Sequence, residues 1–196
     1  MKIIGLTGGS GTGKGTVAAR MRSLGAGWVD ADAVYRGLCA ENRAMLDALD
    51  AAFGGVTDEN GALDRPKLAK IVFSDPEKLA ELNRITTPYI RAASLAAIRA
   101  QSACPVVLYD APTLFEARLE FLCGSIVSVT ADPENCVQRI MKRDGITEEL
   151  ARARLKSQHG EEFYRQRSGF CIENNGTQRQ LAEAAQGVIS QLKGGK

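Results

Sequence analysis

Histidine is nearly absent from this sequence, and cysteine lacks the spacing that metal or disulfide sites need. The chain has one histidine, His159, and five scattered cysteines with no C-x-x-C pair. These numbers exclude a multi-histidine metal centre, and a Ser-His or Cys-His nucleophile would have to use His159. They also predict neither a disulfide framework nor a zinc site. With no obvious partner, His159 is expected to be a surface or packing residue.

Long apolar runs and an excess of one charge are also missing. No run approaches the roughly 20 apolar residues that cross a bilayer, and Met1–Leu6 leads into glycines, unlike a signal peptide. We therefore expect a cytoplasmic protein without a membrane partner. Because 25 Lys and Arg nearly balance 23 Asp and Glu, no overall field favours nucleic acid. Any anion site must be local.

The 196 residues suffice for one α/β domain with excursions. Short apolar runs alternate with longer helical patterns, which predicts a doubly wound, five-stranded parallel sheet covered on both faces. The predicted strands are residues 2–7, 28–30, 106–110, 125–130 and 171–174.

Three helix starts can be read directly. Asp132–Pro133 is typical of an N-cap followed by proline, and Thr177–Gln180 fits a capping box. Asp75–Pro76 indicates another helix, which we expect to bend or break near Pro88.

Two segments are too long for simple crossovers. Residues 35–100 are mostly helical in pattern and predict a helical subdomain, while residues 144–169 are charged, poor in large apolar groups and typical of a mobile lid. The core of this single domain, 1–196, would then comprise about 1–34, 101–143 and 170–196.

Gly8–Thr16 is the strongest chemical signal. It lies between a strand and a helix start and nearly satisfies G-x-x-x-x-G-K-[ST], the phosphate loop of nucleotide-binding proteins. Glycines let successive N–H groups face phosphate oxygens, and Lys14 would reach the β and γ phosphates. The departure is Gly15, which replaces the usual metal-binding hydroxyl, so that a hydroxyl arrives only at Thr16.

Carboxylates follow two of the predicted strands. Asp30 and Asp32 end the second strand, where alternation places them on one face near the ligand crevice of an open α/β sheet. An aspartate there can orient the proton of an attacking hydroxyl, or cap the next helix; we expect Asp30 to be structural and Asp32 catalytic. Asp110 ends a buried strand, as a magnesium-holding aspartate does.

Arg139 and Arg143 lie four residues apart on one helix face. Eight basic residues against five acidic ones between 138 and 167 would suit a lid over a triphosphate, whose charge arginines stabilise during transfer. Most of the eight are ordinary surface residues, and only these two arginines are expected to act.

Together, these segments resemble dephospho-CoA kinase from Lys2 to about Leu192. The motifs that carry the resemblance stand in order along the chain. They are Gly5–Thr16; Val29–Asp32; Gly61–Arg65 with Val72 and Phe73; Leu82–Asn83 through Pro88 to Arg91; Asp110–Glu116; Gln138–Arg139 with Arg143, Arg154 and Gln158; and Ile172–Gly176.

The resemblance implies a P-loop NTPase fold with a helical coenzyme-binding subdomain (35–100) and a helical lid. It implies ATP- and Mg²⁺-dependent phosphorylation of the ribose 3′-hydroxyl of dephospho-CoA, the last step of coenzyme A biosynthesis, by a monomer or weak homo-oligomer. The implied residues are catalytic Asp32, Lys14, Arg139 and Arg143; nucleotide-binding Gly9, Gly11, Thr12, Gly13, Lys14, Gly15, Thr16, Asn174 and Gly176; substrate-binding Asp32, Arg65, Arg91 and Asp110; and metal-binding Thr16 and Asp110.

Three positions depart from the family pattern: Gly15, Thr87 in place of a histidine, and Thr113. The main alternative is another small-molecule or nucleoside monophosphate kinase, which would share the loop and the lid. A nucleotide switch or GTPase is the rival from another class, and the lack of an Asn-Lys-x-Asp motif counts against it.

Overall fold

The computed structural model describes residues 1–194; residues 195–196, the end of the predicted core, lie outside the described residues. Contacts divide the chain into two units, residues 30–99 and the remainder. No helix among the described residues is long and apolar enough to span a membrane. The elements are β1 (Lys2–Thr7), α1 (Lys14–Ser23), β2 (Gly27–Asp30), α2 (Ala31–Glu41), α3 (Arg43–Phe53), α4 (Arg65–Phe73), α5 (Pro76–Ala100), β3 (Val106–Asp110), the 3₁₀ helix η1 (Glu120–Leu122), β4 (Ser125–Thr130), α6 (Pro133–Asp144), α7 (Glu148–Lys156), α8 (Glu161–Arg167), β5 (Phe170–Glu173) and α9 (Gln178–Gly194).

The five strands form one sheet in the order β2-β3-β1-β4-β5. Strand β1 pairs in parallel with β3 and β4, and β4 pairs in parallel with β5. Three strands match the predicted bounds, whereas β2 begins one residue earlier and β5 lies one residue earlier than predicted. Because all strands run the same way, β1, β3 and β4 end together at the edge where the glycine loop begins, which confirms the predicted α/β architecture.

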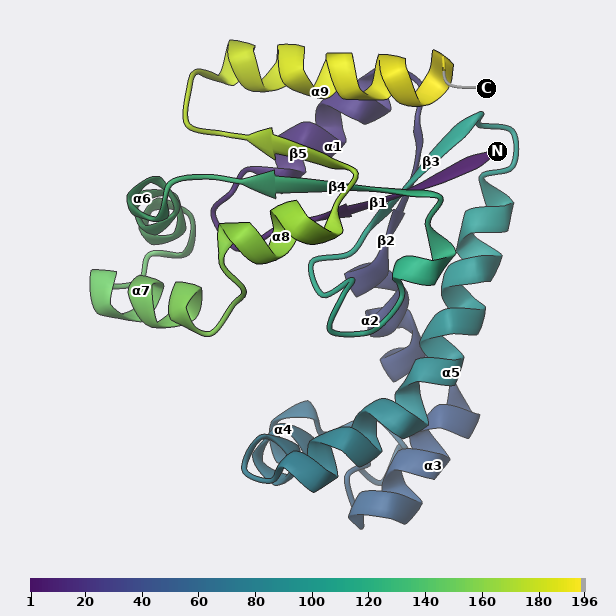
Figure 1. Ribbon diagram of the computed structural model, residues 1–196. Coiled ribbons are helices and arrows are strands. Elements are labelled where there is room, and N and C mark those ends of the chain that lie inside the picture. Colours follow the sequence, from purple (N-terminus) through teal and green to yellow (C-terminus); the bar gives the residue numbers. More distant parts are fainter. Residues whose placement is uncertain (195–196) are drawn as a thin grey trace. The chain divides into compact units, whose positions relative to one another are not determined.

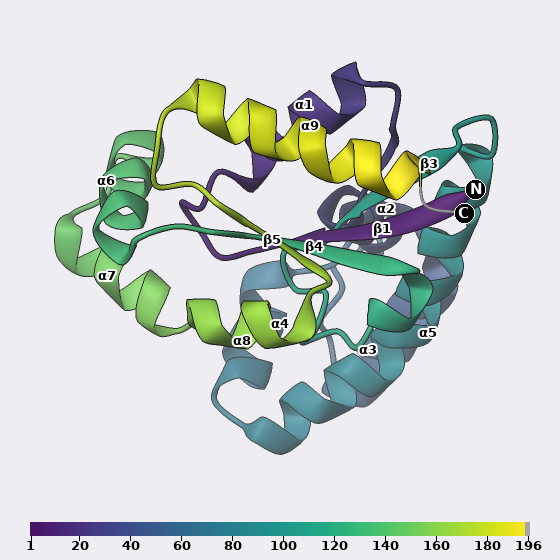
Figure 2. The ribbon, with the colours of Figure 1, turned by 45° about the horizontal axis from the view of Figure 1, so that its top comes forward.

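Helices cover both faces of this sheet. Helices α1 and α9 lie side by side on one face, and α8 lies against β4 and β5 on the other (Figures 1 and 2). The first face carries the main core, to which the strands contribute fully buried side chains such as Ile4 and Leu108. The helices add Val17, Met21 and Ile189. This burial fixes α1, and with it the loop that precedes α1.

The two helix starts predicted in the sheet unit are confirmed. The Asp132 side chain accepts from the Glu134 N–H, with Pro133 in the first turn. The Thr177 N–H donates to Gln180 Oε1 at 2.8 Å, and the Gln180 N–H donates back to Thr177 Oγ1 at 3.3 Å. The two hydrogen bonds between Thr177 and Gln180 together have the reciprocal geometry of a capping box.

Residues 30–99 form a helical unit with its own core. Leu38, Met45, Leu49 and Val72 are buried there, and side chains of α5 pack against them. We expected a bend or a break near Pro88: a break is wrong, because α5 continues through that residue, whereas a bend agrees with Figure 1, in which the helix curves. Packing on both sides of the proline holds the two halves together at the cost of one backbone hydrogen bond.

Asp30 caps helix α2, as expected for a structural residue. Its Oδ1 accepts the N–H of Asp32 at 2.9 Å and that of Ala33 at 3.1 Å. The helix begins directly after Asp30, so Asp32 lies in its first turn. The prediction that Asp32 ends an extended strand, on the same face as Asp30, is therefore wrong. The capping side chain turns the backbone into a helix before alternation can apply.

The cap predicts a stability effect that is separable from catalysis. Asp30→Ala should lower the free energy of unfolding by about 1 kcal/mol, because two helix N–H groups lose their acceptor. Asp30→Asn keeps the acceptor and should stay close to the parent in urea unfolding followed by circular dichroism. Equal stability of the alanine variant and the parent would contradict this capping role.

Candidate active site

The glycine loop between β1 and α1 is shaped by three glycines with positive φ. Gly8, Gly11 and Gly13 have φ values of 144°, 77° and 93°, a region that side chains disfavour. A Cβ atom at these glycines would lie 2.3 Å from the Val129 carbonyl oxygen, 2.6 Å from the Cys136 carbonyl oxygen and 2.2 Å from Asn174 Nδ2, respectively. The loop backbone therefore packs directly against β4, α6 and the residue after β5.

Arg139 and Asn174 hold the middle of this loop. Asn174 is buried, and its Nδ2 donates to the Thr12 carbonyl oxygen at 2.8 Å. Arg139 donates from Nη1 to the Gly11 carbonyl oxygen at 3.2 Å and from Nη2 to the Asn174 carbonyl oxygen at 3.0 Å. These hydrogen bonds from the Arg139 and Asn174 side chains to loop carbonyls restrain the loop backbone.

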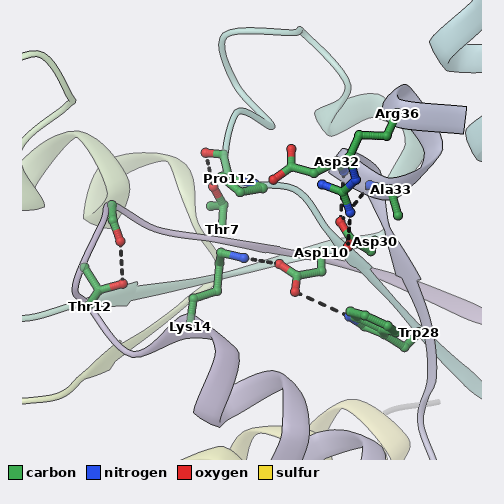
Figure 3. A network of polar contacts seen from close by, with 11 residues as sticks. Thr7, Thr12, Lys14, Trp28, Asp30, Asp32, Ala33, Arg36, Asp110 and Pro112 are labelled. Carbon is green, nitrogen blue, oxygen red and sulfur yellow. Dashed lines mark hydrogen bonds and ion pairs between the residues drawn. The ribbon is translucent and has the colours of Figure 1, made fainter. Parts of the chain in front are cut away.

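Lys14, at the start of α1, forms an ion pair with Asp110 at the end of β3. Figure 3 shows the ammonium group directed at Oδ1 of this buried carboxylate. The other oxygen, Oδ2, accepts from Trp28 Nε1 at 3.3 Å, and the Arg22 guanidinium lies 4.3 Å from the centre of the Trp28 ring. The buried carboxylate thus has a cation on one oxygen and a neutral donor on the other.

The loop lines a cavity of about 810 Å³. The structure brings Arg139 and Arg143 to the same cavity, as expected from their spacing. Thr12 lines a smaller neighbouring cavity of about 130 Å³. The larger cavity is lined by the predicted site residues Gly9, Gly11, Gly13, Lys14, Gly15, Thr16, Arg139 and Arg143, and by Pro112, Thr113, Glu116, Gln158, His159 and Tyr164 among others.

Arg143 is anchored beside the cavity by its neighbour Asp144. The guanidinium donates to the two carboxylate oxygens at 2.7 and 2.9 Å, and Arg154 contacts the same carboxylate. Hydrogen bonds, first from Arg143 and then from Arg154, lower the pKa of Asp144 to about 2. The Asp144 hydrogen bonds in turn raise the pKa of Arg143. Arg143 therefore keeps its charge and presents it at the cavity.

The segment between α7 and α8 supplies residues that the sequence left unassigned. Gln158 hydrogen-bonds to Ser10 of the loop, and the His159 ring stacks on Phe163 with centroids 3.5 Å apart. His159 Nε2 also lies 3.5 Å from Glu116 Oε1, so the expectation that it has no partner is wrong, although its packing role stands. Gln158 and Ser10 are 148 residues apart in the sequence, and no local pattern predicts such a pairing.

Of the other predicted residues, two belong to the sheet unit and three to the helical unit. Thr16 is exposed in the first turn of α1, and no atom lies within 4 Å of a Cβ built on Gly15. Gly176 follows β5, and a Cβ there would meet Gln180 Oε1 at 2.3 Å. Asp32, Arg65 and Arg91 belong to the helical unit, where the Arg65 guanidinium lies 5.9 Å from the centre of the Tyr35 ring.

Comparison with known proteins identifies the family to which a chain with this loop belongs. A model of the dephospho-CoA kinase family matches residues 2–180. This chain belongs to that family. A dephospho-CoA kinase from Syntrophotalea carbinolica is 40% identical over 98% of this chain and 92% of its own length.

Two solved structures are similar to this chain over nearly its full length. One from Campylobacter jejuni is named as a dephospho-CoA kinase. It is 26% identical with a TM-score of 0.72, and the match covers 100% of this chain and 99% of that one. A Thermus thermophilus crystal structure is 36% identical with a TM-score of 0.82, and 97% of each chain is covered. The glycine loop of this family member is thus set in a P-loop kinase fold.

The loop geometry predicts opposite effects for two neighbouring glycines. Gly13→Ala should disrupt the loop, because its φ is positive and the new methyl group would meet Asn174. Gly15→Ala has open space and an ordinary φ, so it should be tolerated and can add up to about 1 kcal/mol of helix stability. Thermal unfolding of the two variants compares them directly, and a Gly13→Ala variant as stable as Gly15→Ala would contradict the packing argument.

The Lys14–Asp110 pair predicts a separation of stability from turnover. Lys14→Met should destabilise the fold by about 3 kcal/mol, because it leaves a buried carboxylate without its cation. Adding Asp110→Asn should restore much of that stability while turnover stays lost. Lys67→Met removes an exposed lysine of the helical unit and serves as the control in urea unfolding and ADP-release assays. Recovery of turnover in the double variant would refute the role of Lys14.

Proposed function

We propose that this chain transfers the terminal phosphoryl group of ATP to the ribose 3′-hydroxyl of dephospho-CoA, giving coenzyme A and ADP as in the last step of coenzyme A biosynthesis. The observation that carries the proposal is the relationship to dephospho-CoA kinases over nearly the full chain, combined with an intact lysine-bearing phosphate loop. The bond between the β–γ bridging oxygen and the γ phosphorus breaks, and a bond from the acceptor oxygen to that phosphorus forms. The acceptor proton passes to a carboxylate, which we assign to Asp32.

The loop residues supply positioning and charge for this transfer. Backbone N–H groups from Gly9 to Thr16, together with the positive end of α1, would bind the phosphates. Lys14 would exchange Asp110 for the β and γ phosphates, where its charge stabilises the transition state. Arg143 would do the same from its own position in the cavity lining.

Arg139, Asn174 and Gly176 complete the proposed nucleotide site. Arg139 lines the cavity while bonding two loop carbonyls, so its proposed catalytic part includes holding the loop. Asn174 is buried against Thr12 and supports nucleotide binding through the loop backbone.

Magnesium ion is the proposed metal, and hard oxygen donors suit it. Asp110, at the carboxyl end of β3, and Thr16, in the first turn of α1, would hold it. The Asp110 carboxylate already lies beside the loop lysine, which fits a cation-binding position. When bound, the ion would neutralise phosphate charge. Gly15 provides no hydroxyl, so Thr16 is the one assigned.

The acceptor and the setting follow the same assignment. We propose that the helical unit binds the coenzyme through Asp32, Arg65 and Arg91, that Asp110 contributes to the same site, and that residues 144–169 act as a lid. We also propose a cytoplasmic monomer or weak homo-oligomer without nucleic acid partners. The alternative, another small-molecule or nucleoside monophosphate kinase, differs only in the acceptor.

An acceptor panel tests the proposed function. A coupled ADP-release assay with ATP and Mg²⁺ should show turnover with dephospho-CoA and none above background with AMP, CMP or shikimate. Asp32→Asn should lower turnover at least about 100-fold, because the acceptor hydroxyl loses its base, while the melting temperature is retained. Turnover with another acceptor would replace the substrate assignment, and tight GTP binding without any transfer would remove the kinase assignment.

A further inference from the structure

Ser10, in the first half of the phosphate loop, is held by one glutamine from the segment between α7 and α8. The Ser10 N–H donates to Gln158 Oε1 at 2.8 Å, and Gln158 Nε2 donates to Ser10 Oγ at 3.0 Å. Both polar ends of the carboxamide are therefore used on one residue. A reciprocal pair of this kind fixes the orientation of the serine as well as its distance.

This part of the loop needs external support. Gly9 and Gly11 flank Ser10 and give the backbone wide conformational freedom. Arg139 and Asn174 hold the Gly11 and Thr12 carbonyls, but neither bonds to Ser10. Gln158 supplies the corresponding anchor for the first half, and its Oε1 would lie 3.2 Å from a Cβ on Gly9.

Gln158 is itself well positioned. Its backbone N–H donates to the Leu155 carbonyl oxygen at 3.0 Å, which continues the last turn of α7. The next residue, His159, stacks on Phe163 with an interplanar angle of 9° and lies beside Glu116. The glutamine thus reaches the loop from a backbone held on both sides, and it lines the same cavity as Lys14.

We propose that Gln158 is a positioning residue for nucleotide binding. It holds Ser10, and through Ser10 the first half of the phosphate loop, in the arrangement that receives the nucleotide phosphates. Because both hydrogen bonds are exposed to solvent, each contributes modestly, and their effect should be on the bound loop more than on the fold. The proposal rests on the proposed function only in taking ATP as the ligand.

Calorimetric binding of ATP to the full chain, with Mg²⁺ and without acceptor, tests this proposal. Gln158→Ala should weaken ATP binding about tenfold, as expected for the loss of two exposed hydrogen bonds. The ratio kcat/KM for ATP should fall by a similar factor, while KM for dephospho-CoA and the melting temperature stay unchanged. A general structural defect would not produce that split.

A double-mutant cycle with Ser10→Ala ties the effect to the contact. Ser10→Ala removes only the hydroxyl acceptor, so its loss should be smaller, and combining it with Gln158→Ala should add nothing. Gln166→Ala is the matched control, because Gln166 is an α8 glutamine that bonds Glu162 at 2.9 Å instead of the loop. Its ATP affinity should equal that of the parent.

Three results would overturn the proposal. Unchanged ATP affinity in Gln158→Ala would show that the loop needs no such anchor, and tighter binding would show that the glutamine obstructs the loop. Fully additive losses in the double variant would show that Gln158 acts elsewhere. Since ATP binding is measured without acceptor, failure to phosphorylate dephospho-CoA would count against the proposed function alone.

Discussion

The close backbone packing of the phosphate loop is the constraint on which the rest of the site depends. A loop that surrounds an anion needs its N–H groups turned inward, so its other side must lie directly on neighbouring elements. Here those neighbours are Val129 of β4, Cys136 of α6 and Asn174 after β5, each within 3 Å of where a glycine Cβ would stand. Three elements that are distant from the loop in sequence must therefore reach it together, and parallel pairing of β1, β4 and β5 brings two of them to one sheet edge.

The Lys14–Asp110 pair suits a site that works by exchange of partners. A half-buried lysine needs a counter-charge, and Asp110 provides one at the end of the adjacent strand. In the proposed reaction, phosphates would take over this cation, and the released carboxylate would then be available to a metal ion. Trp28 keeps its hydrogen bond to the other oxygen, which restrains the rotation of the carboxylate. The single tryptophan thus has a polar role that its bulk does not reveal.

Sequence patterns sufficed where a structural feature is local, and failed where it depends on distant partners. Buried runs ending in polar residues located β1, β3 and β4 to the residue, because parallel strands covered on both faces are continuously apolar. Of the bend or break expected at Pro88, the helix shows a curve and no break, since packing across residues 79–93 outweighs the loss of one hydrogen bond. Asp32 was placed in a strand because the alternating pattern was extended two residues past the capping residue Asp30. The Gln158–Ser10 contact joins residues 148 apart, and neither a serine nor a glutamine predicts its partner from the local sequence.

The same contrast bears on which parts of the molecule can move. The sheet and its helices share a continuous apolar core, whereas α7 meets α6 through a small cluster of Val137, Ile140 and Ala151. Ion pairs around it, such as Arg152 with Glu134, are exposed and contribute little each. Helix α7, in the segment proposed as a lid, is thus attached by interactions that can break and reform. Helix α8 of the same segment packs against β4 and β5 with Tyr164 buried, and the phosphate loop is also fixed by packing. Gln158 follows α7 and bonds Ser10 through an exposed carboxamide, so this contact can open without a large loss of stability of the fold.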